Sequence, residues 1–246
     1  MKLSDAILST TLACTILGIF GSNVIMKKEY DRIDKSDPYW NYGALMAQPF
    51  RHLVITGGNV TNIFYEQSPK YAVKVMKAWR GFRDGSVQTH VSNDTLYVNF
   101  SNQYESIYEK FWLSHVVPVR IFSPGLLSVT GYQTKLIVDK FDRPDIKINI
   151  TENSKVQVNC YRNVLERIEV SQKDSCMIAF RVSEDLFVPD AITIHEAAVS
   201  GTGTSLLNVK SCRIEKLGLH LEGNASIALS GYTLGQLEAM TGKSAE

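Results

Sequence analysis

Acidic side chains offer the most direct route to catalysis in this sequence of 246 residues. Four of them lie close together in the chain, namely Asp139, Asp142, Asp145 and Glu152. In carbohydrate-active β-helix enzymes, two carboxylates on neighbouring coils act together, one as general acid and one as base or nucleophile. Acidic residues at strand ends are more often solvated corner residues. A carbohydrate-active β-helix enzyme with paired acidic residues is therefore the alternative hypothesis, and a protein without enzymatic activity is the main one.

Histidine, cysteine and serine form no catalytic or metal-binding motif in this sequence. The histidines at positions 52, 90, 115, 195 and 220 include no HxxxH or HxH pair that would place two ligands on one metal. No cysteine has a CxxC partner, and no serine lies in a GxSxG turn. Residues 241–244 imitate the end of a phosphate loop, but Leu237 stands where its first glycine is needed. We therefore predict no catalytic residue, no metal ligand and no bound cofactor.

A repeated pattern of short alternating apolar segments runs from Leu126 to Tyr232. Residues 148–150 are followed by 156–158, and residues 219–221 by 227–229, each time across a polar corner. Strict alternation is typical of half-buried strands, and clusters of Asn, Gly and Ser are typical of tight turns. Units start near residues 127, 148, 168, 192 and 219, a spacing of roughly 20 to 27 residues that is typical of stacked repeats.

This repeat predicts the fold class. One unit cannot bury its apolar side alone, whereas stacked units cover one another. We therefore expect an all-β protein, a β-solenoid or right-handed β-helix-like stack with an N-terminal transmembrane helix. An ordinary β-sandwich is the alternative, because it also consists of short strands separated by polar turns.

The N-terminal 26 residues are expected to form a signal anchor. Residues 6–26 are uncharged and span 21 positions, which as a helix is about 30 Å, the thickness of the hydrocarbon core of a bilayer. Polar residues dilute the segment, so a cleaved signal peptide is the alternative, although a small-x-small cleavage site is hard to place. The positive-inside rule favours a cytoplasmic location for the residues that follow, because of Lys27, Lys28, Arg32 and Lys35.

Four segments follow from these patterns: an anchor at 1–26, a tether at 27–49, a β-repeat domain at 50–232, and a cap and tail at 233–246. The net charge of +1 argues against nucleic-acid binding, as does the lack of a Lys/Arg cluster interleaved with aromatic residues. Outside the anchor only three cysteines remain. Three is a small and odd number, so they do not form a disulfide framework. A single bridge between Cys160 and Cys176 stays open in an oxidising compartment.

Several stretches of the β-repeat domain resemble one known family. Residues 50–61, the strand at 71–75 and residues 94–98 resemble the opening of the "putative auto-transporter adhesin, head GIN domain" family. Repeats with Ser, Gly and Asn corners, such as residues 221–227 and 229–231, resemble its body. The resemblance implies a right-handed β-helix-like fold and export in Bacteroidetes-type bacteria, and it supplies no catalytic residues.

These observations favour a membrane-anchored cell-envelope protein that has no enzymatic activity. It would contact the membrane through residues 6–26 and bind an envelope protein or a glycan through its repetitive surface, as an adhesin-like protein or a scaffold. We expect an anchor in the inner membrane with the β-repeat domain in the periplasm, and exposure at the cell surface stays open. A scaffold that faces the cytoplasm is a third hypothesis, which follows from the positive charges after the anchor.

Overall fold

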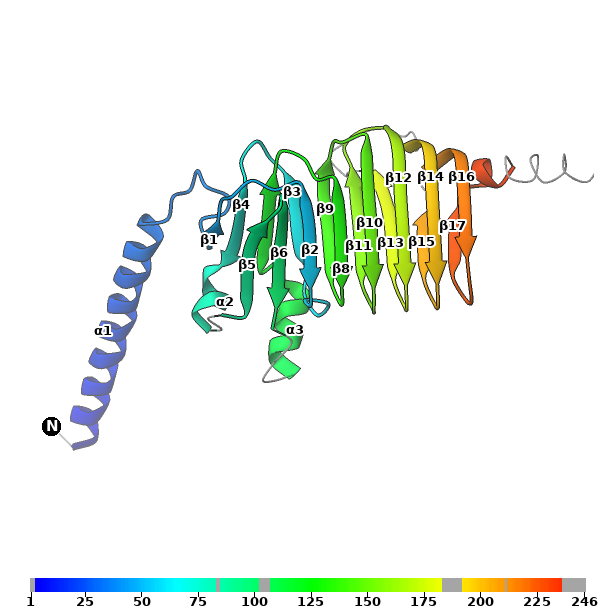
Figure 1. Cartoon of the computed structure of the whole chain (residues 1–246). Coiled ribbons are helices and arrows are strands. Elements are labelled where there is room, and N and C mark those ends of the chain that lie inside the picture. The colour runs from blue at the N-terminus through cyan, green and yellow to red at the C-terminus, as the bar shows by residue number, and fades with distance from the viewer. Residues whose placement is uncertain (1–2, 83–84, 102–106, 183–191, 211, 236–246) are drawn as a thin grey trace, which may run out of the picture. The chain divides into compact units, whose positions relative to one another are not determined.

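The computed structural model describes residues 3–82, 85–101, 107–182, 192–210 and 212–235 (Figure 1). The chain divides into two compact units, Met1–Tyr42 and Gly43–Glu246. We call the second unit the β domain.

The first unit contains one long helix, α1 (Leu3–Asp31). Its apolar side chains lie on all sides of the helix and are exposed, which is typical of a helix surrounded by lipid and not of one packed on a protein core. The hydroxyl groups of Thr10, Thr11 and Thr15 donate hydrogen bonds of 2.9 to 3.0 Å to carbonyl oxygens four residues earlier. These bonds lower the cost of placing the polar residues in lipid. By length and composition α1 could cross a membrane, and a signal sequence has the same properties.

The strands of the β domain form two large sheets. The nine-stranded sheet has the order β1 (Tyr42–Met46), β4 (Ala72–Met76), β7 (Val119–Ser123), β3 (Ile63–Gln67), β9 (Lys135–Phe141), β11 (Lys155–Cys160), β13 (Met177–Val182), β15 (Leu206–Val209), β17 (Ser226–Leu229). The eight-stranded sheet has the order β16 (Cys212–Leu221), β14 (Ile192–Thr202), β12 (Val164–Lys173), β10 (Asp145–Thr151), β8 (Ser128–Tyr132), β2 (His52–Thr56), β6 (Thr95–Phe100), β5 (Val87–Ser92). Two helices interrupt the strands, α2 (Lys77–Phe82) and α3 (Ile107–His115).

The prediction of a β-solenoid or right-handed β-helix-like stack is wrong as a fold class. The strands form two mixed sheets that do not close: β4 pairs with β7 and β5 with β6 in antiparallel orientation, while the other pairs with a described register are parallel. One local cause is the turn Asn93-Asp94, where both residues have positive φ (48° and 61°). Two such residues form the tight hairpin that joins β5 to β6, so this part of the chain turns back on itself.

The repeat units of the sequence occupy neighbouring strands. The starts near residues 127, 148, 168, 192 and 219 fall at β8, β10, β12, β14 and β16, which lie side by side in the eight-stranded sheet. After each corner the chain enters the nine-stranded sheet, as β9, β11, β13, β15 and β17. Residues with positive φ lie at these corners, among them Glu152, Asn153, Gly203 and Gly223.

One hydrophobic core fills the β domain. It combines buried side chains of both sheets, such as Ile148 and Val170 of the eight-stranded sheet and Val158 and Phe180 of the nine-stranded one. Burying each such side chain stabilises the fold by about 1.5–3 kcal/mol relative to exposure. No described residue of the Met1–Tyr42 unit belongs to this core. The β domain therefore has what it needs to fold without α1.

The cysteines of the described chain are all free. The Cys160–Cys176 bridge that the sequence left open does not form, because Lys155 pairs with Met177 and Cys160 therefore lies about 20 Å further along the strand direction than Cys176. Burial raises the pKa of the Cys160 thiol, and it raises the pKa of Cys212 to about 12. Both thiols stay protonated and pack as small apolar groups.

The C-terminal segment begins with a short helical turn at residues 231–235. The Thr233 side chain is buried there, and its hydroxyl oxygen accepts a hydrogen bond of 3.2 Å from the backbone N–H of Ile214. The turn thus covers part of β16. The rest of the predicted cap and tail, residues 236–246, lies outside the described residues.

Candidate functional site

A shallow hollow lies on the outer face of the eight-stranded sheet, over β10, β12, β14 and β16. Its volume is about 480 Å³. The residues that line it are Lys147, Ile148, Glu169, Val170, Ser171, Ala198, Val199, Ser200, Gly218, Leu219 and His220. We call this site the hollow.

The hollow follows from a change of side-chain size along one row of the sheet. The parallel register pairs Lys147 with Glu169, Glu169 with Ala198, and Ala198 with Gly218. Two long side chains are thus followed by a methyl group and a hydrogen atom. A Cβ atom added at Gly218 would meet only the Ala197 carbonyl oxygen, at 3.8 Å, so the space above this position is open.

Fixed charges border one side of the hollow. The Glu169 carboxylate accepts from Lys147 Nζ and from Arg167 Nη2, each at 2.9 Å. The hydrogen bond from Lys147 lowers the pKa of Glu169 below its ordinary value, and the charges of Lys147 and Arg167 add to this effect. Glu169 is therefore ionised at neutral pH, and it acts only as a hydrogen-bond acceptor.

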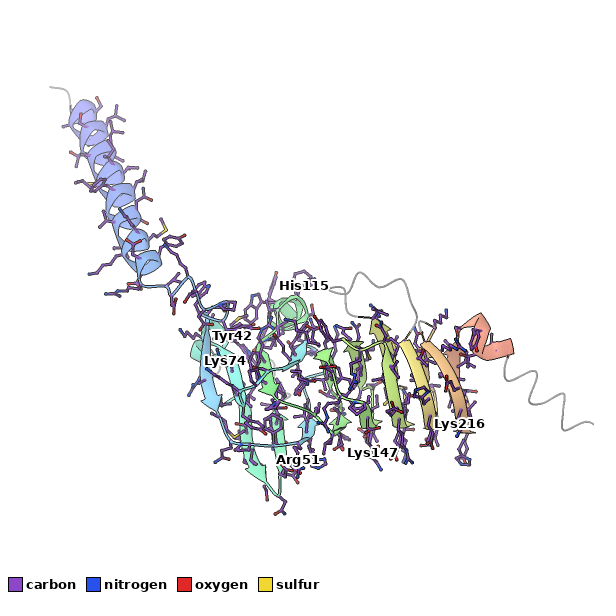
Figure 2. The ribbon with its side chains drawn as sticks, turned by 90° about the horizontal axis from the view of Figure 1, so that it is seen from above. Tyr42, Arg51, Lys74, His115, Lys147 and Lys216 are labelled. Atoms are coloured by element: carbon purple, nitrogen blue, oxygen red, sulfur yellow. The ribbon has the colours of Figure 1, made fainter. Side chains whose placement is uncertain are left out.

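A second row of charges crosses the same strands. The register places Asp145 beside Arg167, Arg167 beside Glu196, and Glu196 beside Lys216, so that the sign alternates along the row. Figure 2 shows Lys147 and Lys216 along the same long side of the β domain as Arg51. A partner surface that carries both positive and negative side chains would be electrostatically complementary to this row.

A pair of one histidine and one glutamate lies on β14 and β16, two of the same strands. His195 Nδ1 and Glu215 Oε2 are 2.7 Å apart. The hydrogen bond with Glu215 raises the pKa of His195 above its ordinary value; desolvation opposes this shift, and the charges of Glu215 and Glu166 add to it. This pair is a titratable feature of the outer face.

The four acidic residues considered for catalysis do not share one site. Asp139 lies on β9 and accepts a hydrogen bond of 2.9 Å from Asn159, whereas Asp145 begins β10 in the other sheet. Glu152 follows the last residue of β10, about 20 Å along the strand from Asp145. Asp142 borders a second hollow and pairs with Arg162 at 3.5 Å. None of the four lines the hollow on the eight-stranded sheet.

The histidines are dispersed over the β domain and make separate local contacts. His52 Nδ1 lies 2.7 Å from Ser128 Oγ, the ring of His90 stacks on Tyr97, and His220 contacts Glu222 at 3.1 Å. Within the described part of the chain, no group of three His, Cys, Asp or Glu side chains is arranged to hold a metal ion.

The sequence analysis missed the hollow. Its residues lie far apart in the sequence, and only the pairing of strands brings them into one row. A signal was nevertheless present: Lys147, Glu169, Ala198 and Gly218 occupy equivalent positions in successive repeat units. Aligning the units would have shown the loss of side-chain volume, had their lengths been known.

Comparisons with known proteins give limited information. No family model and no curated protein matches the sequence, so the family resemblance stated from the sequence is not confirmed. Among solved structures, a "putative adhesin" from Parabacteroides distasonis has a TM-score of 0.48 at 13% identity, covering 76% of this chain and 80% of its own. One from Parabacteroides merdae has a TM-score of 0.46 at 14% identity, with the same coverages of 76% and 80%.

A third structure has a different name. A "putative lipid binding protein" from Parabacteroides distasonis has a TM-score of 0.37 at 14% identity, over 77% of this chain and 92% of its own. With TM-scores below 0.5, we draw no conclusion about function from any of the three.

Proposed function

We propose that this protein is a membrane-anchored cell-envelope protein, without enzymatic activity, that binds a polypeptide partner through the hollow. The observation that carries the proposal is the small-residue floor at Ala198 and Gly218 beside the ion pair of Lys147 and Glu169. An apolar centre with a polar rim is the usual anatomy of a protein interface.

The chemistry of the hollow favours a polypeptide over the other hypotheses. Among the described residues that line it, none is Trp, Tyr or Phe, so it has no aromatic ring on which a sugar could stack. Glu169 is the one carboxylate in this set, whereas a glycosidase needs two. The carbohydrate-active enzyme therefore has no support at this site.

The binding test uses the β domain, Gly43–Glu246, immobilised and exposed to an extract of the cell envelope. Ala198→Trp would fill the hollow and is expected to weaken retention of the partner about tenfold or more. Ala228→Trp is the matched control: it is the same substitution at a partly exposed position of β17, in the opposite sheet. Equal retention by the two variants would contradict the proposal, and glycan binding that Ala198→Trp abolishes would replace the polypeptide with a glycan.

The location of the β domain is the other part of the proposal. We infer that α1 stays in the inner membrane and that the β domain lies in the periplasm. Protease treatment of intact cells, with detection of a C-terminal tag, should leave the protein whole. Opening the outer membrane should then expose it to cleavage. Cleavage in intact cells would place it on the surface, and resistance after the outer membrane is opened would place it in the cytoplasm.

A further inference from the structure

Helix α3 carries its aromatic side chains on the side that faces away from the core. Tyr108, Phe111 and Trp112 are 86%, 67% and 39% exposed. Together with His115 they occupy positions i, i+3, i+4 and i+7, which share one side of a helix. That spacing normally marks the side that a helix buries. In α3 it marks the exposed side, and we call these four residues the aromatic face.

Contacts on the opposite side hold α3 in this orientation. Leu113 is fully buried, and Glu109 is nearly so. The Thr61 hydroxyl donates a 2.9 Å hydrogen bond to the carbonyl oxygen of Leu113, and Asn62 Nδ2 donates one of 3.2 Å to that of Ser114. Rolling the helix to bury its aromatic rings would break these bonds. The exposed aromatic face is therefore built into the fold.

We propose that the aromatic face docks on the surface of a lipid bilayer, with its rings at the level of the headgroups. Tyrosine and tryptophan favour this region, because an apolar ring and a polar group are satisfied there together. Exposed Phe and Trp on a short helix are typical of proteins that lie on a membrane. A membrane would lie close to the β domain, because α1 is long and apolar enough to cross one.

Chain length permits the docking. Between the end of α1 at Asp31 and the start of β1 at Tyr42 there are ten residues, which span at most about 35 Å. In the nine-stranded sheet only β4 separates β1 from β7, the strand that follows α3, a lateral distance of about 10 Å. A domain tethered this closely meets the bilayer at a high effective concentration, so a weak aromatic contact suffices.

Charge near α3 is compatible with an anionic membrane. Because β4 and β7 are antiparallel, the end of β4 lies at the same edge of the sheet as the start of β7. Helix α2, which follows β4, carries Lys77 and Arg80, and α3 carries Lys110. Each basic residue near an anionic surface contributes attraction.

The aromatic face is separate from the hollow. Figure 2 shows His115, the last residue of α3, on the opposite side of the β domain from Lys147 and Lys216. Docking through α3 therefore leaves the hollow free to bind its partner. The inference shares with the proposed function only the presence of a membrane anchor, and its test does not use α1.

The test measures binding of the β domain alone, Gly43–Glu246, to vesicles of phosphatidylethanolamine and phosphatidylglycerol by co-sedimentation. The double variant Tyr108→Ser/Phe111→Ser is expected to bind about tenfold more weakly than the unaltered domain. The matched control, Tyr132→Ser/Tyr161→Ser, removes two aromatic rings that are 40% and 46% exposed elsewhere and should bind as the unaltered domain does. Circular dichroism of each variant verifies that it is folded.

Tryptophan fluorescence gives a second readout. The β domain contains two tryptophans, Trp79, which is 2% exposed, and Trp112 on the aromatic face. Adding vesicles should shift the emission of Trp112 to shorter wavelength, and Trp112→Phe should abolish the shift.

Three results would overturn the inference. The first is that the unaltered domain remains in the supernatant. The second is that the control pair loses binding as strongly as the α3 pair. The third is that the domain is a dimer that Tyr108→Ser/Phe111→Ser converts to a monomer. The last result would assign the aromatic face to a second copy of the chain. None of the three bears on partner binding at the hollow.

Discussion

The β domain consists of two regions that are built differently. In the regular half, residues 128–229, every strand pair with a described register is parallel, and each strand of the eight-stranded sheet is followed along the chain by one of the nine-stranded sheet. In the irregular half, residues 42–123, antiparallel pairs and two helices interrupt this order. Both halves share one core.

The difference shows how each half creates a surface. In the regular half, equivalent residues align in rows, so the change from Lys147 and Glu169 to Ala198 and Gly218 is enough to form the hollow. In the irregular half, the ring of Trp79 stacks on that of Phe100, with 6.3 Å between the ring centroids. Its exposed feature is a helix held by specific hydrogen bonds. In the regular half, a binding face arises from residues on several paired strands. In the irregular half, one helix is enough to form such a face.

The largest effect is expected from removing an inward side chain of the regular half. Ile148 is fully buried, so Ile148→Ala should lower the free energy of unfolding by about 2–5 kcal/mol through lost burial and a cavity. Urea denaturation measures the change. Asn149→Ala, at the exposed neighbouring position, should change it by less than about 0.5 kcal/mol. Similar losses in both variants would show that the alternation of β10 is assigned to the wrong face.

Close packing at one corner gives the next largest effect. A Cβ atom at Gly131 would lie 2.6 Å from Thr134 Cγ2 and 3.2 Å from Ile150 Cγ2. Gly131→Ala should therefore cost about 1–3 kcal/mol in thermal or urea unfolding. Gly218→Ala, in the same sheet but above open space, should be nearly neutral. A neutral Gly131→Ala would contradict the packing of this corner.

A buried hydroxyl group tests the irregular half. Tyr65 is fully buried, and its hydroxyl group lies 2.9 Å from Ser123 Oγ and 3.2 Å from the Ser123 carbonyl oxygen. Tyr65→Phe should destabilise the domain by about 0.5–1.5 kcal/mol. Tyr161→Phe, at an exposed position, is the control and should have no measurable effect. The same unfolding energy for both would argue against the β3–β7 contact.

The smallest effect concerns His195. Because Glu215 raises its pKa, NMR titration should place the pKa of His195 above the ordinary value near 6.5. A raised folded pKa means that the pair stabilises the fold fully below the unfolded pKa, and that this contribution is lost as pH rises through the folded pKa. Glu215→Gln should return the titration toward 6.5, whereas Glu222→Gln should leave it unchanged. An unchanged titration in Glu215→Gln would rule out the 2.7 Å contact.

Sequence patterns predicted the elements of this fold better than their arrangement. The apolar composition of residues 6–26 predicts a long apolar helix, and α1 contains it. Alternation predicts strands such as β10. Alternation says which side of a strand is buried, but it does not say which strand lies beside it. Alternation could therefore not predict the antiparallel pairs of the irregular half, and it could not predict the fold class that depends on them.

The two surface features were hidden for different physical reasons. The hollow depends on a register among residues 147, 169, 198 and 218, which no local pattern specifies. The aromatic face was hidden by a pattern that is misleading, because rings spaced at i, i+3, i+4 and i+7 usually predict a buried side. The exposed fractions of the aromatic rings show that this side faces solvent, and the hydrogen bond from Thr61 to Leu113 holds it there.

Site-specific photo-crosslinking in living cells tests the central claim most directly. A photoreactive amino acid would replace Ala198 in the hollow of the full-length protein, or Ala228 in the opposite sheet as the control. Our account predicts a discrete crosslinked protein band from position 198 and none from position 228. Crosslinks of equal intensity from both positions, or from neither, would contradict the assignment of the hollow as a polypeptide-binding site.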